Sequence, residues 1–229
     1  MLNETESKKK KEALRKEALK KDALRQEFLH KRRLFVQSKG SSLVQVHSQL
    51  VDYLEAIFPK AFGSKTFGIA ATYFPKQDEA DPNGVAERLS GWQFAYPRVE
   101  GEHLRFWIPE GAQAFLTGFF GINEPIVEQS CPASLEDCQV ILVPGVVFDR
   151  RGGRIGYGKG FYDRTLKNCQ GLKIGVGYTA QMSAENLPVN SADVYMDWIV
   201  TEEFAIETKL TKGDEDEPAS KERNLSNGN

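Results

Sequence analysis

The feature that most restricts the fold is a glycine-rich segment between an apolar run and a helix-forming run. Residues 152–164 read GGRIGYGKGFYDR, with five glycines in the first nine positions. Upstream, residues 140–143 (VILV) are continuously apolar, which predicts a sheet strand covered on both faces. Downstream, residues 161–169 (FYDRTLKNC) predict a helix. Ligands of α/β proteins bind beyond the carboxyl ends of strands, so a site is expected at this loop.

The rest of the chain alternates predicted helices and strands. Residues 42–58 carry apolar side chains at three- and four-residue steps, which predicts an amphipathic helix that Pro59 ends. A further helix is expected at 83–92, and strands at 67–74, 93–97, 103–108, 173–179 and 198–201. This order predicts an α/β fold of three layers, α/β/α, with a mostly parallel central sheet in a single domain.

The two ends differ from the middle in composition. Residues 1–33 hold twelve Lys or Arg against six Asp or Glu, without Gly or Pro, and predict a long basic helix whose outer part protrudes. Residues 207–229 have almost no apolar side chains and predict a disordered tail. We therefore divide the chain into a basic extension (1–20), a ligand-binding domain (21–206) and the tail.

Composition and cysteine content exclude several classes of protein. The chain is 40% hydrophobic with a formal net charge of −2, as in ordinary globular proteins. Cys131, Cys138 and Cys169 form neither a C-x-x-C motif nor a zinc-type pairing with histidine. Neither a membrane helix nor a secretory signal is visible. We expect a cytoplasmic monomer that acts on small molecules, with no membrane or nucleic-acid partner.

The glycine loop has the composition of a phosphate cradle. Gly156, Gly158 and Gly160 alternate as G-x-G-x-G, so consecutive backbone N–H groups can form a concave donor surface, and Arg154 and Lys159 add charge. The following helix N-terminus adds partial positive charge. The pattern is neither G-x-G-x-x-G nor G-x-x-x-x-G-K-[ST], which excludes those two nucleotide-binding families. A glycine-rich turn without a ligand is the alternative.

An acidic residue follows the loop directly. Asp163 lies in the first predicted helical turn, where the helix dipole favours a carboxylate. Beside a bound phosphate, that carboxylate is compatible only with a bridging cation, and Mg²⁺ is the natural candidate. Helix capping is the alternative role.

Residues 143–166, VPGVVFDRRGGRIGYGKGFYDRTL, strongly resemble the signature of the 5-formyltetrahydrofolate cyclo-ligase family, also called methenyltetrahydrofolate synthetases. Other segments that resemble the family follow in its order: KDALRQEFLHKRR, YFPKQDEAD, YPRV, GINEP and LPVNSADVYMDWIVTE. The resemblance covers residues 20–204. It implies ATP-dependent cyclisation of 5-formyltetrahydrofolate to 5,10-methenyltetrahydrofolate, with release of ADP and phosphate.

The resemblance also implies roles for individual positions. Lys21 and Arg25 match a pair that reaches the nucleotide phosphates; Lys11 and Arg15 have the same spacing, but only the second copy is followed by Arg32. Lys159 and Tyr162 are the implied catalytic residues. The implied ATP-binding set is Lys21, Arg25, Arg154, Ile155, Gly156, Tyr157, Gly158, Lys159, Gly160, Phe161 and Tyr162.

The resemblance also implies which residues bind the metal and the folate. Asp163 and Asp193 match the Mg²⁺ ligands, with Asp197 as the fallback. Asp81, two residues after Glu79, matches an acidic position that binds the pterin, whose amino and ring N–H groups form a donor edge suited to a carboxylate. Plain loop acids are the alternative for both residues. The implied substrate-binding set is Glu79, Asp81, Tyr157, Gly158, Lys159, Gly160 and Phe161.

The implied reaction requires the protein mainly to position the two substrates and to neutralise phosphate charge. The formyl oxygen attacks the γ-phosphate of ATP, and the amine at position 10 then closes the ring. Phe161 stands where the family usually has tyrosine, and the basic extension has no counterpart in the family core. Two alternatives therefore stay open: a folate- or nucleotide-binding protein without catalysis, and RNA binding through residues 8–33, which interleaved acids weaken.

Overall fold

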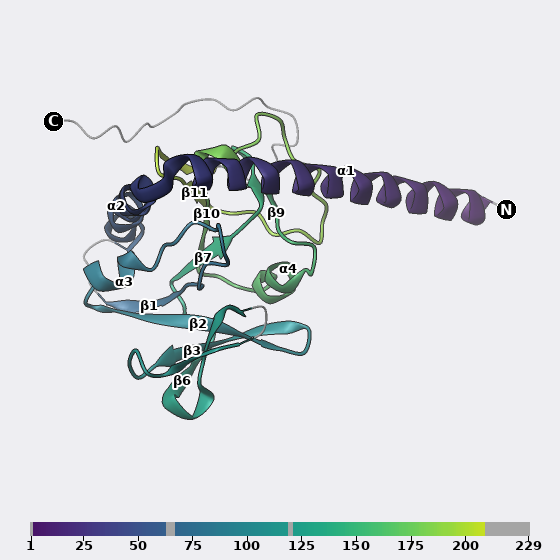
Figure 1. The fold of residues 1–229 in the computed structure, drawn as a ribbon. Coiled ribbons are helices and arrows are strands. Elements are labelled where there is room, and N and C mark those ends of the chain that lie inside the picture. The colour runs from purple at the N-terminus through teal and green to yellow at the C-terminus, as the bar shows by residue number, and fades with distance from the viewer. Residues whose placement is uncertain (1, 63–66, 119–120, 209–229) are drawn as a thin grey trace.

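The computed structural model describes residues 2–62, 67–118 and 121–208. One long helix, α1 (Leu2–Lys39), leads through a single 3-10 turn, η1 (Gly40–Ser42), into α2 (Leu43–Phe62). Figure 1 shows the N-terminal half of α1 projecting beyond the rest of the protein, and its side chains from residue 6 to residue 16 are all exposed. The predicted basic helix is confirmed and continues to Lys39.

The second helix packs through the apolar stripe that its sequence predicts. Leu50, Leu54 and Ile57 are completely buried. The expected end at residue 58 is wrong, because α2 continues through Pro59 to Phe62. Proline lacks an N–H donor and disturbs the carbonyl four residues earlier, but this close to a helix end it interrupts only the last turn.

The centre of the protein is one eight-stranded sheet of order β12-β11-β10-β7-β1-β2-β3-β6. The five strands from β11 to β2 run parallel, whereas β12, β3 and β6 join antiparallel at the two edges. The mostly parallel sheet is therefore confirmed. Its strands are β1 (Gly68–Ala71), β2 (Trp92–Glu100), β3 (His103–Pro109), β6 (Ser130–Ala133), β7 (Val140–Pro144), β10 (Leu172–Val176), β11 (Trp198–Val200) and β12 (Ala205–Glu207).

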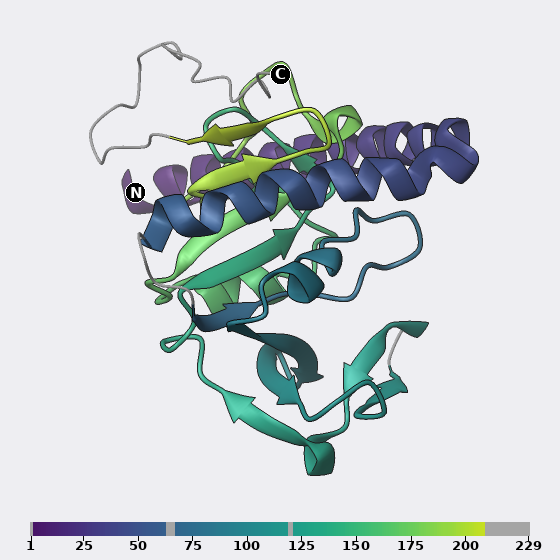
Figure 2. The ribbon, with the colours of Figure 1, turned by 90° about the vertical axis from the view of Figure 1, so that its left-hand side faces the viewer.

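Helices cover both faces of this sheet (Figure 1, Figure 2). α1, α2 and the short α3 (Gly84–Arg88) lie on one face, and α4 (Phe161–Leu166) lies on the other. Alternate side chains of β7 point to opposite faces. Val140 and Leu142 pack in the core that contains α2, while Ile141 and Val143 pack with Leu166 of α4. The predicted three-layer architecture is confirmed.

Several short elements are not visible as patterns in the sequence. The strands β6 and β12 and two hairpins have two to four residues each, too few to establish a period of two. The hairpins are β4 (Phe115–Thr117) with β5 (Asn123–Pro125), and β8 (Val147–Phe148) with β9 (Arg154–Ile155). Two further 3-10 turns are η3 (Val127–Gln129) and η4 (Thr179–Gln181).

The C-terminal end of the described chain is structured slightly further than expected. β12 includes Glu207, the first residue of the expected tail, and the Thr208 N–H donates to the carbonyl of Asp197 at 2.9 Å. The rest of the expected tail, 209–229, lies outside the described residues. No helix in the described ranges combines the length and apolar character needed to cross a membrane.

Candidate active site

A cavity of about 770 Å³ opens at the carboxyl ends of the parallel strands. Pro144 at the end of β7, and Tyr73 and Phe74 just after β1, lie on its wall. The remaining walls come from α1, the segment 76–79, β2, β3, β5, the glycine loop, α4 and the segment 190–193. The position matches the sheet edge at which α/β proteins bind ligands.

The cavity gathers nearly every residue expected from the sequence. Asp81 and the fallback Asp197 are not among the described residues that line it; Asp197 instead accepts from the Lys173 N–H at 2.8 Å. Those that do line it are Lys21, Arg25, Glu79, Arg154, Ile155, Gly156, Tyr157, Gly158, Lys159, Gly160, Phe161, Tyr162, Asp163 and Asp193.

Backbone conformation explains why the loop needs glycine. Gly158 and Gly160 have φ angles of +87° and +68°, in the left-handed region that other residues rarely adopt. A Cβ on Gly156 would stand 2.8 Å from the guanidinium of Arg154. The helix that follows, α4, is only six residues long, so its dipole contributes less than a full helix would. Side-chain cations must therefore carry most of the positive charge.

Each of two expected phosphate-binding cations is paired with an expected metal-binding acid. Lys21 Nζ lies 2.5 Å from Asp193 Oδ2, and Arg154 Nη2 lies 2.8 Å from Asp163 Oδ1. Burial lowers the pKa of Lys21, but its hydrogen bonds to Asp193 and Glu17 outweigh that effect and leave the pKa raised. Arg25 Nε donates to the carbonyl of Gly156 at 2.8 Å, which fixes α1 to the glycine loop.

Asp163 and Asp193 suit a Mg²⁺ site in which phosphate oxygens of the nucleotide would supply further ligands. No group of three or more His, Cys, Asp or Glu in the described part of the chain forms a metal cage. Mg²⁺ usually takes one or two carboxylates together with phosphate oxygens and waters. Asp163 and Asp193 lie on the wall of the same cavity as the glycine loop, and thus provide a donor set of that kind.

Of the two acids in the implied substrate-binding set, Glu79 lines the cavity, whereas Asp81, the implied pterin acid, is not among the described residues that line it. Glu79 is 7% exposed, and its Oε2 accepts the Lys76 N–H at 2.7 Å. Burial raises the pKa of Glu79, against the smaller lowering effects of that N–H and of Arg32. Asp81 instead accepts the backbone N–H and the side-chain amide of Asn83, at 2.9 and 2.7 Å, and so shapes the turn before α3.

Aromatic and aliphatic side chains form an apolar wall that the sequence did not reveal. Phe74, on the cavity wall, stacks on Tyr96 at 4.6 Å between ring centroids, and Phe115 meets both rings edge-on. Tyr157 also lines the cavity. Burial raises the pKa of its hydroxyl to about 12, so this side chain stays uncharged at neutral pH. Flat apolar walls of this kind suit a flat ligand. The aliphatic and proline members of the wall are Pro97, Val99, Leu104 and Ile122.

Comparison with known proteins agrees with this geometry. The sequence model of the 5-formyltetrahydrofolate cyclo-ligase family matches residues 8–202. The chain belongs to this family. It is 41% identical over 78 residues to 5-formyltetrahydrofolate cyclo-ligase of Haemophilus influenzae, covering 33% of this chain and 41% of that protein. It is 30% identical over 125 residues to a probable 5-formyltetrahydrofolate cyclo-ligase of Schizosaccharomyces pombe, covering 48% of this chain and 61% of that protein.

The matched segments thus span less than two thirds of these two relatives, but solved structures match over nearly their full length. The NMR structure of Aquifex aeolicus 5,10-methenyltetrahydrofolate synthetase is 29% identical with a TM-score of 0.70, covering 89% of this chain and 97% of that one. A Mycoplasma pneumoniae 5,10-methenyltetrahydrofolate synthetase shares the fold at 23% identity and a TM-score of 0.61, covering 80% and 99%.

Asp149 has a structural role that was not predicted from the sequence. It lies within the segment 143–166 that resembles the family signature. It is 1% exposed; its Oδ1 accepts the N–H groups of Arg151 and Gly153, and its Oδ2 accepts that of Leu187, all within 2.9 Å. These bonds close the turn between β8 and β9 and attach it to the segment before Asp193. The F-D pair within the quoted signature is the signal that marked the position.

Asp149→Asn is expected to destabilise the protein by about 2 kcal/mol, because the amide N–H₂ cannot accept the third N–H and leaves a buried donor unpaired. The measurement is the urea midpoint of unfolding at constant m-value. Asp137→Asn, at an exposed position, is the control and should leave the midpoint unchanged. An equal midpoint for both variants would contradict the role of Asp149.

Proposed function

We propose that this protein cyclises 5-formyltetrahydrofolate to 5,10-methenyltetrahydrofolate at the expense of ATP, with ADP and phosphate as the other products. The observation that carries the proposal is the make-up of one cavity. The glycine loop with Lys21 and Arg25 forms a cationic wall for a triphosphate, while Glu79 and Phe74 lie on a wall suited to a flat ring with a donor edge. Membership of the cyclo-ligase family supports the same assignment.

The chemistry needs two reactants held together and charge neutralised. The formyl oxygen attacks the γ-phosphorus and ADP departs; the amine at position 10 then adds to the activated carbon, and loss of phosphate leaves the methenyl bridge. Lys21, Arg25 and Lys159 neutralise phosphate charge, and no covalent protein nucleophile is required. Mg²⁺, held by Asp163 and Asp193, would supply further charge neutralisation at the phosphates.

On the folate side we assign the pterin-binding acid to Glu79 and not to Asp81. Of these two acids, Glu79 alone lies on the cavity wall among the described residues, and its carboxylate can accept the amino and ring N–H groups of a pterin. Phe161 and Tyr162 add flat surface next to the glycine loop, so the loss of a hydroxyl at Phe161 leaves ring contact possible. We also propose that the protein works as a cytoplasmic monomer.

Incubation of the purified protein with 5-formyltetrahydrofolate is expected to produce the near-ultraviolet absorbance of the methenyl product only when ATP and Mg²⁺ are both present. Omission of ATP, its replacement by ADP, and chelation of the metal are the controls. Because the proposal requires phosphoryl transfer, ADP and phosphate should appear in equal amounts with the product. Absence of product at every enzyme concentration tested would reject the function.

A further inference from the structure

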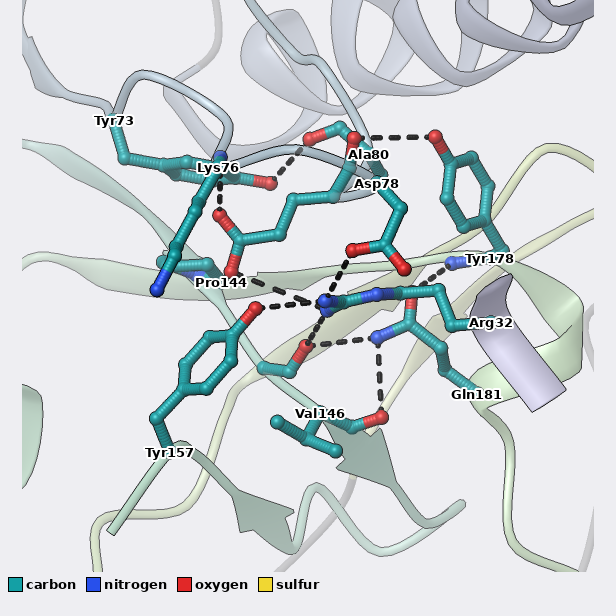
Figure 3. A network of polar contacts seen from close by, with 12 residues as sticks. Arg32, Tyr73, Lys76, Asp78, Ala80, Pro144, Val146, Tyr157, Tyr178 and Gln181 are labelled. Atoms are coloured by element: carbon teal, nitrogen blue, oxygen red, sulfur yellow. Dashed lines mark hydrogen bonds and ion pairs between the residues drawn. The ribbon is translucent and has the colours of Figure 1, made fainter. Parts of the chain in front are cut away.

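A buried cation, the guanidinium of Arg32, lies behind the cavity, between the cationic wall and the wall that carries Glu79. Arg32 of α1 is 1% exposed and is not among the described residues that line the cavity. Its Nη2 lies 2.7 Å from Asp78 Oδ1 and 2.7 Å from the hydroxyl of Tyr157 (Figure 3). Its Nη1 lies 4.0 Å from Glu79 Oε1 and 3.5 Å from the carbonyl of Gly145. One guanidinium thus contacts both the segment 76–81, called the acidic loop below, and Tyr157 of the glycine loop.

A buried arginine at this place needs an explanation beyond stability. Removing a charge from water costs free energy that its ion pairs only partly repay, and apolar side chains of similar volume often stabilise a protein more. Arginine differs from such side chains, and from lysine, in its planar fork of donors, which holds several acceptors in a fixed arrangement. The acceptors here come from segments about 80 residues apart in the chain.

We propose that Arg32 is a positioning residue that sets Glu79 and Tyr157 relative to each other, and thereby aligns the folate with the nucleotide. The inference rests on the proposed function, because it takes Glu79 as the folate acid and Tyr157 as part of the nucleotide loop. Arg32 touches neither ligand; it acts through these two cavity-lining residues.

The backbone of the acidic loop is held independently of Arg32. The Tyr73 hydroxyl donates to the carbonyl of Ala80 at 2.8 Å, and the Tyr178 hydroxyl donates to the carbonyl of Glu79 at 3.2 Å. Tyr178 is itself 2.8 Å from His47 Nε2 of α2. Replacement of Arg32 therefore removes side-chain alignment and charge while these backbone anchors persist.

Arg32 also acts on the charge of Glu79. Burial raises the pKa of the Glu79 carboxyl, and the positive charge of Arg32 opposes that rise, whereas the negative charge of Asp78 adds to it. As the pH falls through this pKa, Glu79 becomes protonated and can no longer accept two N–H groups from a pterin. The titratable and charged groups that face Glu79 are Arg32, Tyr73, Lys76, Asp78, Tyr157 and Tyr162.

The first test compares Arg32→Gln with Arg32→Lys. In Arg32→Gln the KM for 5-formyltetrahydrofolate should rise about tenfold, with a smaller change in the KM for ATP, since the ion pair with Glu79 and the charged hydrogen bond to Asp78 are both lost on the folate side. The acid limb of kcat/KM for folate should move to higher pH. Arg32→Lys should restore the acid limb, because the charge remains, without restoring KM, because an ammonium lacks the fork.

Asp78→Asn gives a matched comparison that keeps Arg32. Removal of the Asp78 charge should move the acid limb to lower pH, opposite to Arg32→Gln, because Asp78 raises the pKa of Glu79. General loosening of the loop would move both variants in the same direction and would overturn the proposal. If Arg32→Gln does not fold, judged by circular dichroism, two predictions still test the proposal: Arg32→Lys should raise KM with the acid limb unchanged, and Asp78→Asn should move the acid limb to lower pH.

The second test measures binding of 5-formyltetrahydrofolate without ATP, by protein fluorescence, in Arg32→Gln, Glu79→Gln and the double variant. If Arg32 acts through Glu79, Arg32→Gln should weaken binding about tenfold in the wild-type background but less than about twofold in the Glu79→Gln background. Independent, additive effects would overturn the inference. A wild-type protein that binds folate but never cyclises it would reject the proposed function alone, because this cycle does not depend on turnover.

Discussion

Asp163→Asn should lower kcat by about 100-fold or more, because the variant loses a carboxylate at the place where phosphate charge must be neutralised. Asn keeps an oxygen that can still accept from Arg154, whose guanidinium also donates to the carbonyl of Pro144 at 3.2 Å. The fold should therefore persist, with a stability loss of about 1 kcal/mol. The measurements are kcat as a function of Mg²⁺ concentration and a thermal unfolding curve.

Asp22→Asn is the matched control for Asp163→Asn. Asp22 also pairs with an arginine, Arg25, but its side chain is 67% exposed and it does not line the cavity. Its replacement should leave kcat and the Mg²⁺ requirement close to those of the wild type. An Asp163→Asn protein with wild-type kcat and Mg²⁺ dependence would exclude Asp163 as a metal ligand.

Glu79→Gln should raise the KM for 5-formyltetrahydrofolate by about 100-fold and leave the KM for ATP nearly unchanged. The amide presents an N–H₂ donor where the pterin also presents donors, and a site with mismatched buried polar groups discriminates strongly. Steady-state kinetics with each substrate varied in turn would measure the split. A parallel rise in both KM values would indicate damage to the whole cavity instead.

Asp81→Asn tests the assignment of the acid directly. It changes the same kind of group two positions later in the chain, in the turn that precedes α3. An asparagine side-chain oxygen can still accept the Asn83 N–H, so folate kinetics should stay near wild type. If Asp81→Asn lost folate affinity while Glu79→Gln kept it, the pterin acid would have to be reassigned to Asp81.

The sequence revealed the parts of the site that are local along the chain. The apolar run, the alternating glycines and Asp163 are contiguous, and the chain order strand, loop, helix determines that they meet at one end of a sheet. The sequence prediction assigned the pterin position to Asp81, with Glu79 in the same substrate-binding set, although the spacing of Asp81 and Asn83 is that of an Asx turn, in which an aspartate bonds the backbone two residues on. That local signal favours a turn-forming role for Asp81 and leaves Glu79 as the candidate pterin acid.

Contacts between distant segments were not visible in the sequence. The Lys21–Asp193 pair joins residues 172 positions apart, and the contact between Arg32 and Tyr157 joins residues 125 apart. Periodicity reports which face of a helix is apolar, but not which partner a polar side chain meets. Similarly, α1 is continuous across residue 20, where composition placed a boundary, and Glu17 already accepts from Asn190 at 2.6 Å.

The left-handed glycines at 158 and 160 have a consequence for selectivity. Glycine positions offer only amide hydrogens, which recognise negative charge and the spacing of oxygens but carry no information about a purine or a pyrimidine. Any preference among nucleoside triphosphates must therefore arise from side chains that line the cavity, such as Tyr157 and Lys159 between the glycines and those of α1 and the segment 190–193. Variation in these side chains can change which base is accepted while the contacts of the glycine amides with the triphosphate stay the same.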